Sequence, residues 1–217
     1  ERLDQRKKDH IDLALVSQVK GAFSDSRFYY EPLMGTHIQK EIPLPYTLAG
    51  KQMLFPLWVS SMTGGTAYAG KINKRLARAC NEFGLGMGLG SCRIILDSKK
   101  YISDFDVRGE IGNDAPLFAN LGIAQIESIL KSKDWDKVNQ LIAGLKADGL
   151  IIHVNPLQEW LQPEGDKITL RPIDIIEVAL HKIKFPIIVK EVGQGMGPES
   201  LKAVMKMPLE AIEFAAL

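Results

Sequence analysis

The stretch GLIIHVNPLQEWLQPEGD at 149–166 holds the densest group of side chains that could do chemistry. It begins as an apolar run typical of a buried strand and continues into a polar, proline-containing segment. An imidazole, two amides and a carboxylate stand at the junction, on His153, Asn155, Gln158 and Glu159. The alternative interpretation is an ordinary transition from a strand to a loop, where polar residues are common. Because binding and catalytic residues concentrate on loops held by a rigid scaffold, a functional site is the favoured interpretation.

The order of these groups predicts how they would be presented. Side chains alternate along a strand, so His153 and Asn155 are expected on one face. Pro156 favours an extended Asn155 and ends the strand, which would leave Gln158 and Glu159 on a loop. Glu159 is a hard oxygen ligand suited to Mg²⁺, particularly when a phosphate shares the ion. Gln158 is a poor acid or base, so proton transfer beside it requires another carrier, and a cofactor is the favoured one.

Lys190 is the second informative residue, because it interrupts the apolar run PIIVKEV at 186–192. An unpaired ammonium is costly in a buried strand. Three interpretations stay open: an ion pair with Glu191 at the rim of the sheet, contact with an anion or an electron-rich cofactor edge, and a Schiff-base lysine.

Three short motifs combine hydroxyl or amide groups with glycine at predicted strand ends. They are SSMTGG at 60–65, GLGS at 88–91 and NLG at 120–122. Glycine lets the backbone approach a flat or anionic ligand closely. Each motif is weak alone, and the signal is their recurrence at equivalent strand ends. GLGMGLGS at 84–91 lacks the spacing of a dinucleotide fingerprint.

The composition is ordinary for a globular protein. The 217 residues are 46% hydrophobic and 24% charged, and the net charge of +1 gives no case for nucleic acid or membrane as a partner. No segment reaches the roughly 18 apolar residues of a membrane helix. The N-terminal ERLDQRKKDH has no apolar region of a secretory signal. Cys80 and Cys92 form neither a disulfide framework nor a metal motif and suit a reducing cytosol, so a cytoplasmic location is predicted.

From residue 51 the chain alternates strands and helices about six times, and its near-continuously apolar strands are typical of a parallel α/β sheet. The first strand is predicted at 53–61. A doubly wound sheet and a TIM (β/α)8 barrel both fit. Polar residues recur at the strand ends, where a barrel builds its site, and this favours the TIM barrel. Only about six of its eight strands are represented, so we expect the chain to be incomplete and the phosphate site after the last two strands to be missing.

Residues 1–50 are predicted to form an N-terminal helix and an extended arm, and residues 51–217 a partial barrel that is the single catalytic domain. The helix begins with a basic cluster that includes Arg6 and Lys7. Cations at a helix N-terminus oppose the helix dipole. A solvated helix end and an anionic ligand are equally supported explanations of this placement.

Taken in order, these motifs resemble type II isopentenyl-diphosphate delta-isomerase, the FMN-dependent family. The resemblance runs from RKKDH at 6–10 through SSMTGG, GLGSCR and HVNPLQE to PIIVKEVGQGMG at 186–197. It implies a TIM barrel, a homo-oligomer (tetramer or octamer), reduced FMN, Mg²⁺, and NADPH as the reductant. The implied reaction interconverts isopentenyl and dimethylallyl diphosphates by protonation and deprotonation.

The resemblance also implies a role for each matching residue. Gln158 is the implied catalytic residue, in contact with the substrate near the reacting carbons, and Glu159 is the implied Mg²⁺ ligand. The other implied substrate contacts are Arg6, Lys7, Arg93, His153 and Asn155. The implied FMN contacts are Ser61, Met62, Thr63, Ser91, Asn120 and Lys190.

Two other functions stay open. An FMN-dependent oxidoreductase, such as a hydroxy-acid oxidase, shares the barrel but needs a histidine base late in the barrel, and no such residue is visible in this sequence. An incomplete, cofactor-free barrel without activity is the non-enzyme alternative.

Overall fold

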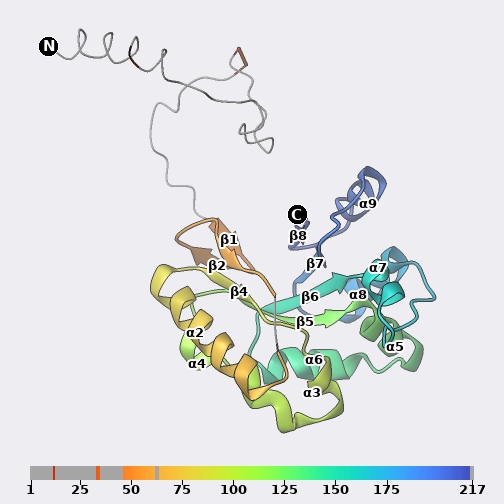
Figure 1. Ribbon diagram of the computed structural model, residues 1–217, viewed down its shortest axis with the longest axis horizontal. Coiled ribbons are helices and arrows are strands. Elements are labelled where there is room, and N and C mark those ends of the chain that lie inside the picture. The colour runs from red at the N-terminus through yellow and green to blue at the C-terminus, as the bar shows by residue number, and fades with distance from the viewer. Residues whose placement is uncertain (1–11, 13–32, 35–45, 62–63, 216–217) are drawn as a thin grey trace, which may run out of the picture. The chain divides into compact units, whose positions relative to one another are not determined.

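The computed structural model describes residues 12, 33–34, 46–61 and 64–215 (Figure 1). The chain divides into two units, residues 1–43 and residues 44–217. The second unit contains the sheets described below. The predicted division between an arm and a catalytic domain at residue 50 stays a prediction.

Six parallel strands form the main sheet, in the order β3-β4-β5-β6-β7-β8 in which they occur along the chain. A doubly wound sheet reverses its strand order at a switch point, whereas a barrel adds each new strand on the same side. The strand order therefore confirms the predicted TIM-barrel architecture, represented by six strands. They are β3 (Trp58–Val59), β4 (Gly86–Gly88), β5 (Leu117–Gly122), β6 (Gly149–Val154), β7 (Ile187–Glu191) and β8 (Ala211–Glu213).

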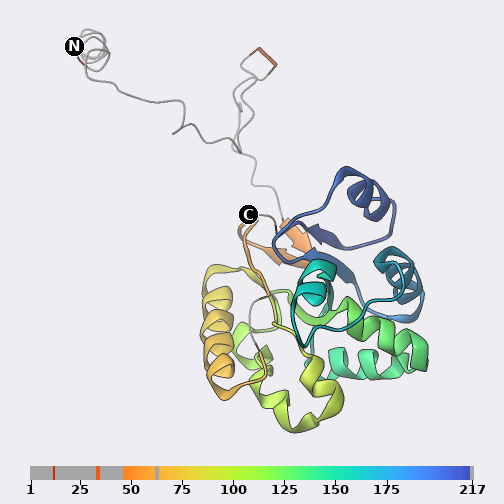
Figure 2. The ribbon, with the colours of Figure 1, turned by 45° about the vertical axis from the view of Figure 1, so that its right-hand side comes forward.

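Helices connect the strands of the sheet (Figure 1). The chain advances around the sheet from α2 to α9 (Figure 2). No helix in the described part of the chain is long and apolar enough to cross a membrane. The helices are α2 (Ala67–Phe83), α3 (Arg93–Asp97), the 3-10 helix η2 (Lys99–Asp104), α4 (Arg108–Ile111), α5 (Ile123–Ser132), α6 (Trp135–Gly144), α7 (Pro156–Leu161), α8 (Pro172–Lys182) and α9 (Pro198–Val204).

Local sequence signals explain where α2 begins and ends. Thr66 accepts a hydrogen bond at its Oγ1 from the Ala69 N–H at 3.1 Å, which satisfies one of the free amides of the first turn. Gly84 ends the helix in the left-handed conformation, with φ 63°. The helix buries Ala77 and Cys80 against the sheet, so Cys80 is a core residue.

The bounds predicted for the first strand, 53–61, are wrong. Lys51–Met53 forms β2, which pairs in an antiparallel hairpin with β1 (Tyr46–Leu48). Only Trp58–Val59 joins the main sheet. Pro56 lies in the bend between the two strands, and its lack of an N–H explains why one continuous strand does not form.

The inner face of the sheet has a packed apolar layer formed by Phe118, Ile151 and Ile188. Trp58 packs edge-on against Phe118, with ring centroids 5.9 Å apart. Leu48 of the β1–β2 hairpin contacts the same cluster. This level of the barrel is a core, so any ligand site on the inner face must lie further along the strands.

The opposite ends of the strands are held together by the buried Arg108 of α4, whose side chain is 7% exposed. Its Nε donates to Lys146 O at 2.9 Å, and one terminal nitrogen donates to Gly112 O and Ala115 O at 2.8 and 3.1 Å. The other terminal nitrogen lies 2.8 Å from Asp148 Oδ2. One guanidinium thus connects the segments that precede β5 and β6.

We expect Arg108→Met to destabilise the fold by about 3 kcal/mol or more, because it leaves three carbonyls and a partly buried carboxylate short of donors. Urea denaturation followed by circular dichroism measures the loss. The matched control is Arg171→Met, because Arg171 also pairs with an aspartate, Asp174, but its side chain is 79% exposed. The control should shift the midpoint little. Equal shifts in the two variants would contradict the structural role given to Arg108.

Candidate active site

A polar layer follows the apolar layer on the inner face of the sheet. Asn120, His153, Lys190 and Glu213 lie on β5, β6, β7 and β8, each two residues beyond an inward-facing apolar residue. His153 is in register with Lys190, and Lys190 with Glu213. Since side chains alternate along a strand, the four groups share the inner face at the carboxyl ends of the strands. Barrel enzymes build their active sites at this end.

His153 is held as a neutral hydrogen-bonding group. Its Nδ1 lies 2.7 Å from Asn120 Oδ1. Burial lowers the pKa of His153 to about 4, and the positive charge of Lys190 lowers it as well, against the raising effect of Glu159. The ring lies against Gly122, where a Cβ atom would come within 2.8 Å of its Nε2. Glycine at this position therefore leaves the room that the imidazole occupies.

Lys190 is 6% exposed and does not form an ion pair with the Glu191 carboxylate, one of the three interpretations that the sequence left open. Its Nζ donates instead to the Glu191 backbone carbonyl at 2.8 Å. None of the ion pairs between described residues includes Lys190. An ammonium has three N–H donors. A ligand with an anionic or electron-rich edge would satisfy the remaining ones.

The segment after β6 is a helix rather than the predicted loop. Pro156 stands in the first turn of α7, where its missing N–H costs nothing. Asn155 is the N-cap residue, and with ψ 46° it does not adopt the predicted extended conformation. The reason is that its carbonyl accepts the Glu159 N–H at 3.0 Å, which starts the helix. The Asn155 side chain turns to α7 as well, where its Nδ2 donates to Glu159 Oε1 at 2.8 Å and lies 3.4 Å from Gln158 Oε1.

Glu159 is half-buried and organises the segment that follows α7. Its Oε2 accepts the Asp166 N–H at 2.7 Å. Gly165 lies so close to the helix that a Cβ atom there would be 1.9 Å from Glu159 O. Among the described residues, no group of three His, Cys, Asp or Glu side chains could hold a metal ion. Glu159 lies close enough to the polar layer for its charge to act on His153.

Two hydroxyls after β3 and β4 are buried without a protein partner. Ser61 Oγ and Ser91 Oγ form no hydrogen bond within the described residues, and neither does Asn155 Oδ1. An unsatisfied buried polar group costs about 1–3 kcal/mol. Such atoms at the carboxyl ends of successive strands are the donors and acceptors expected of a ligand site.

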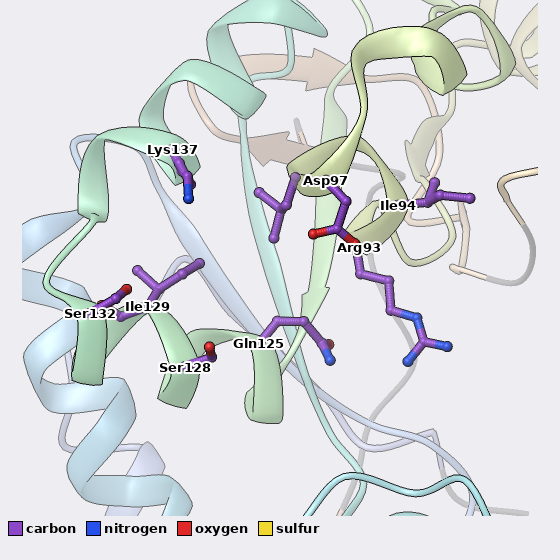
Figure 3. Close-up of a pocket in the computed structure, with 9 residues that line it drawn as sticks. Arg93, Ile94, Asp97, Gln125, Ser128, Ile129, Ser132 and Lys137 are labelled. Atoms are coloured by element: carbon purple, nitrogen blue, oxygen red, sulfur yellow. The ribbon is translucent and has the colours of Figure 1, made fainter.

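Arg93 lies beside the polar layer rather than in it. It lines a cleft of about 570 Å³ where α3 faces α5 and α6 (Figure 3). Its side chain is 62% exposed, and its terminal nitrogen lies 4.0 Å from Asp166 Oδ2. Gln125, on the other side of this cleft, donates to the same carboxylate oxygen at 3.0 Å. Asp166 therefore links Arg93 to the segment that Glu159 holds.

Sequence reasoning missed three residues of this region. Glu213 follows the same two-residue spacing as the rest of the polar layer, so alternation along β8 could have found it. Gln125 contacts Asp166 across 41 positions, which no local signal reveals. Glu191 was considered only as a partner of Lys190. Four predicted site residues, Arg6, Lys7, Met62 and Thr63, lie outside the described residues.

Comparison with known proteins bears on the resemblance seen in the sequence. The isopentenyl-diphosphate delta-isomerase of Rickettsia felis (strain ATCC VR-1525 / URRWXCal2) is 35% identical over 215 residues, or 97% of this chain. The protein of the same name from Rickettsia prowazekii (strain Madrid E) is 37% identical over the same length. The chain is therefore similar in sequence, over nearly its whole length, to proteins of this name. It spans 61% of the length of these relatives.

Two further comparisons add little. No family model matches the sequence. Among solved structures, a mandelate oxidase variant with an FMN adduct matches with a TM-score of 0.45 and 11% identity, over 77% of this chain and 49% of that one. A match with that TM-score does not strengthen the conclusion drawn from the strand order. The sequence similarity to isopentenyl-diphosphate delta-isomerases remains the informative comparison.

The buried imidazole predicts a pH dependence of stability. Above pH 6.5, His153 is neutral in both the folded and the unfolded chain. As the pH falls from 6.5 to about 4, the unfolded chain binds the proton first, so the free energy of unfolding decreases. A His153→Gln variant lacks this term. When the pH falls from 7 to 4.5, we therefore expect the free energy of unfolding of the variant to decrease by about 2 kcal/mol less than that of the unmodified protein.

Urea denaturation at both pH values measures this change. His181→Gln is the control, because it removes an imidazole from an exposed position on α8. If both variants show the same pH dependence, His153 is not the group whose burial weakens the fold in acid.

Proposed function

We propose that the protein interconverts isopentenyl diphosphate and dimethylallyl diphosphate as an FMN- and Mg²⁺-dependent, type II isomerase. The observation that supports this most directly is the polar layer with its buried Lys190, next to the carboxylate of Glu159, within a chain similar in sequence to isopentenyl-diphosphate delta-isomerases. The predicted roles of the site residues are part of the same proposal.

The inner end of the barrel fits a flavin. Among the described residues, Ser61 Oγ and Ser91 Oγ are buried without a hydrogen-bond partner, and the Lys190 ammonium uses one of its three donors. The side-chain amide of Asn120, which contacts His153, can also form a hydrogen bond to the flavin. Met62 and Thr63 complete the proposed FMN contacts. Gln158 is a poor acid or base, so the reduced flavin would act as the proton carrier when bound. NADPH would be the reductant of the flavin.

The region around Glu159 fits a Mg²⁺ ion that the protein shares with the phosphates of the substrate. Mg²⁺ is commonly bound by one or two carboxylates together with substrate phosphates and water. Glu159 is one such carboxylate, and its position is fixed by Asn155 and by the Asp166 N–H. The ion would neutralise the diphosphate and hold it close to α7.

The chain's own residues would bind and orient the substrate. Gln158 on α7 is exposed next to Glu159 and so can reach a diphosphate-bound hydrocarbon chain from the side of the metal. Because its pKa is lowered, His153 is neutral. It can therefore donate or accept a hydrogen bond without adding a positive charge that would attract phosphate. Asn155 holds both Gln158 and Glu159 through one amide. Arg93, Arg6 and Lys7 would supply the cations that the diphosphate requires.

The wider setting belongs to the same proposal. We infer a cytoplasmic homo-oligomer, tetramer or octamer, whose partner is the small diphosphate substrate and neither nucleic acid nor membrane. Residues 51–217 would be the catalytic domain, and residues 1–50 an N-terminal helix and extended arm.

Turnover of isopentenyl diphosphate under anaerobic conditions, with FMN, dithionite and Mg²⁺, tests the proposal. We expect dimethylallyl diphosphate to form with no net consumption of the reductant. In a second assay in air, with FMN and NADPH in place of dithionite, consumption of oxygen or NADPH in proportion to product would instead indicate an FMN-dependent oxidoreductase. Absence of both activities and of FMN binding would support the cofactor-free alternative.

We expect Glu159→Gln to lower kcat/KM roughly 10- to 100-fold and to raise the Mg²⁺ concentration needed for half-maximal rate, because it removes the charge that attracts the ion. Initial rates across a Mg²⁺ titration measure both effects. Glu164→Gln is the matched control, since Glu164 is exposed in the same segment. An unchanged Mg²⁺ requirement in Glu159→Gln would remove Glu159 from the metal site.

A further inference from the structure

Glu191 is a buried carboxylate that the proposed chemistry does not use. It is the last residue of β7 and is 8% exposed. Its register partner is Val154, so it faces the outer side of the sheet while its neighbour Lys190 faces inward. None of the ion pairs between described residues includes Glu191.

Backbone amides, rather than a cation, satisfy this carboxylate. Glu191 Oε2 accepts the N–H groups of Gly193, Gln194 and Gly195 at 2.7, 2.8 and 2.9 Å. Gly195 has φ +76°, a conformation that glycine adopts without strain. A buried charge is stable only while its hydrogen bonds are made. The carboxylate and the folded segment 193–195 therefore depend on each other.

The same residue also orients Lys190. The Glu191 carbonyl oxygen accepts the Lys190 Nζ at 2.8 Å, the one hydrogen bond of that ammonium among the described residues. The side chain of Glu191 is anchored by three amides on one side, so its own peptide group cannot rotate freely. Rotation of that peptide would move the carbonyl and with it the ammonium.

We propose that Glu191 is a positioning residue that acts through Lys190. Its carboxylate, held on the outer side of β7, keeps the segment 193–195 folded and fixes the carbonyl that directs the Lys190 ammonium into the polar layer. This role rests on the proposed function, because the group that the ammonium would meet is the electron-rich edge of the flavin. Glu191 itself touches neither flavin nor substrate.

Two measurements on the flavin-free protein test the positioning directly. In Glu191→Gln, which keeps the shape but loses the charge, we expect amide hydrogen exchange at 193–195 to accelerate roughly tenfold. We also expect faster acetylation of Lys190 by acetic anhydride, measured by mass spectrometry. Glu199→Gln, which alters an 89% exposed glutamate on α9, is the control and should change neither rate. Unchanged exchange and labelling in Glu191→Gln would overturn the proposal.

A double-mutant cycle then tests whether Glu191 acts through Lys190. We expect Glu191→Gln to weaken FMN binding roughly tenfold, and the same change to have little effect in a Lys190→Met background. FMN fluorescence titration measures the dissociation constants, and melting temperatures confirm that each variant is folded. Additive effects would overturn the proposal, because a purely structural role does not require the ammonium.

The two proposals fail in different ways. If the unmodified protein does not bind FMN, the proposed function fails, and the exchange and labelling rates still decide whether Glu191 positions Lys190. If FMN binds and the cycle is additive, the proposed function stands and the role of Glu191 is overturned.

Discussion

The site depends on the alternation of side chains along parallel strands. Inward-facing positions recur at every second residue, so the apolar layer of Phe118, Ile151 and Ile188 is followed at once by Asn120, His153 and Lys190. The apolar layer packs directly beside the site and excludes water from that side of it. The polar groups are consequently buried, and this burial keeps His153 neutral. The alternation of side chains thus places apolar residues in the core and polar residues in the neighbouring site.

Close backbone approaches then refine the positions of the polar groups. Gly122 gives the His153 ring its space, and Gly165 lets the segment after α7 reach the backbone of Glu159. In both places the missing side chain matters more than backbone freedom, because neither glycine has a positive φ. The interactions around Glu191 are of the same kind, since backbone amides rather than side chains satisfy the buried charge.

Homology and geometry support the proposed function from independent directions. The identity of 35–37% extends over 97% of the chain. The geometry adds two buried hydroxyls without partners among the described residues, a buried ammonium and the Glu159 carboxylate, which are groups that the proposed flavin and a shared Mg²⁺ would need. The chain spans 61% of its relatives, so the groups described belong to the portion that they share.

Sequence alone was enough to establish the parallel strand–helix order and most strand positions. Apolar runs and terminal glycines are local signals, and the carboxyl ends of parallel strands must lie together. It also identified His153, Asn120, Lys190 and Glu159 as candidates. Only the tertiary structure decided that Gln158 and Glu159 lie on a helix, because the cap at Asn155 outweighs the extended preference before proline. It likewise decided the partners of Lys190, Asp166 and Glu191, since these contacts depend on loops whose conformation is set by hydrogen bonds that no sequence period encodes.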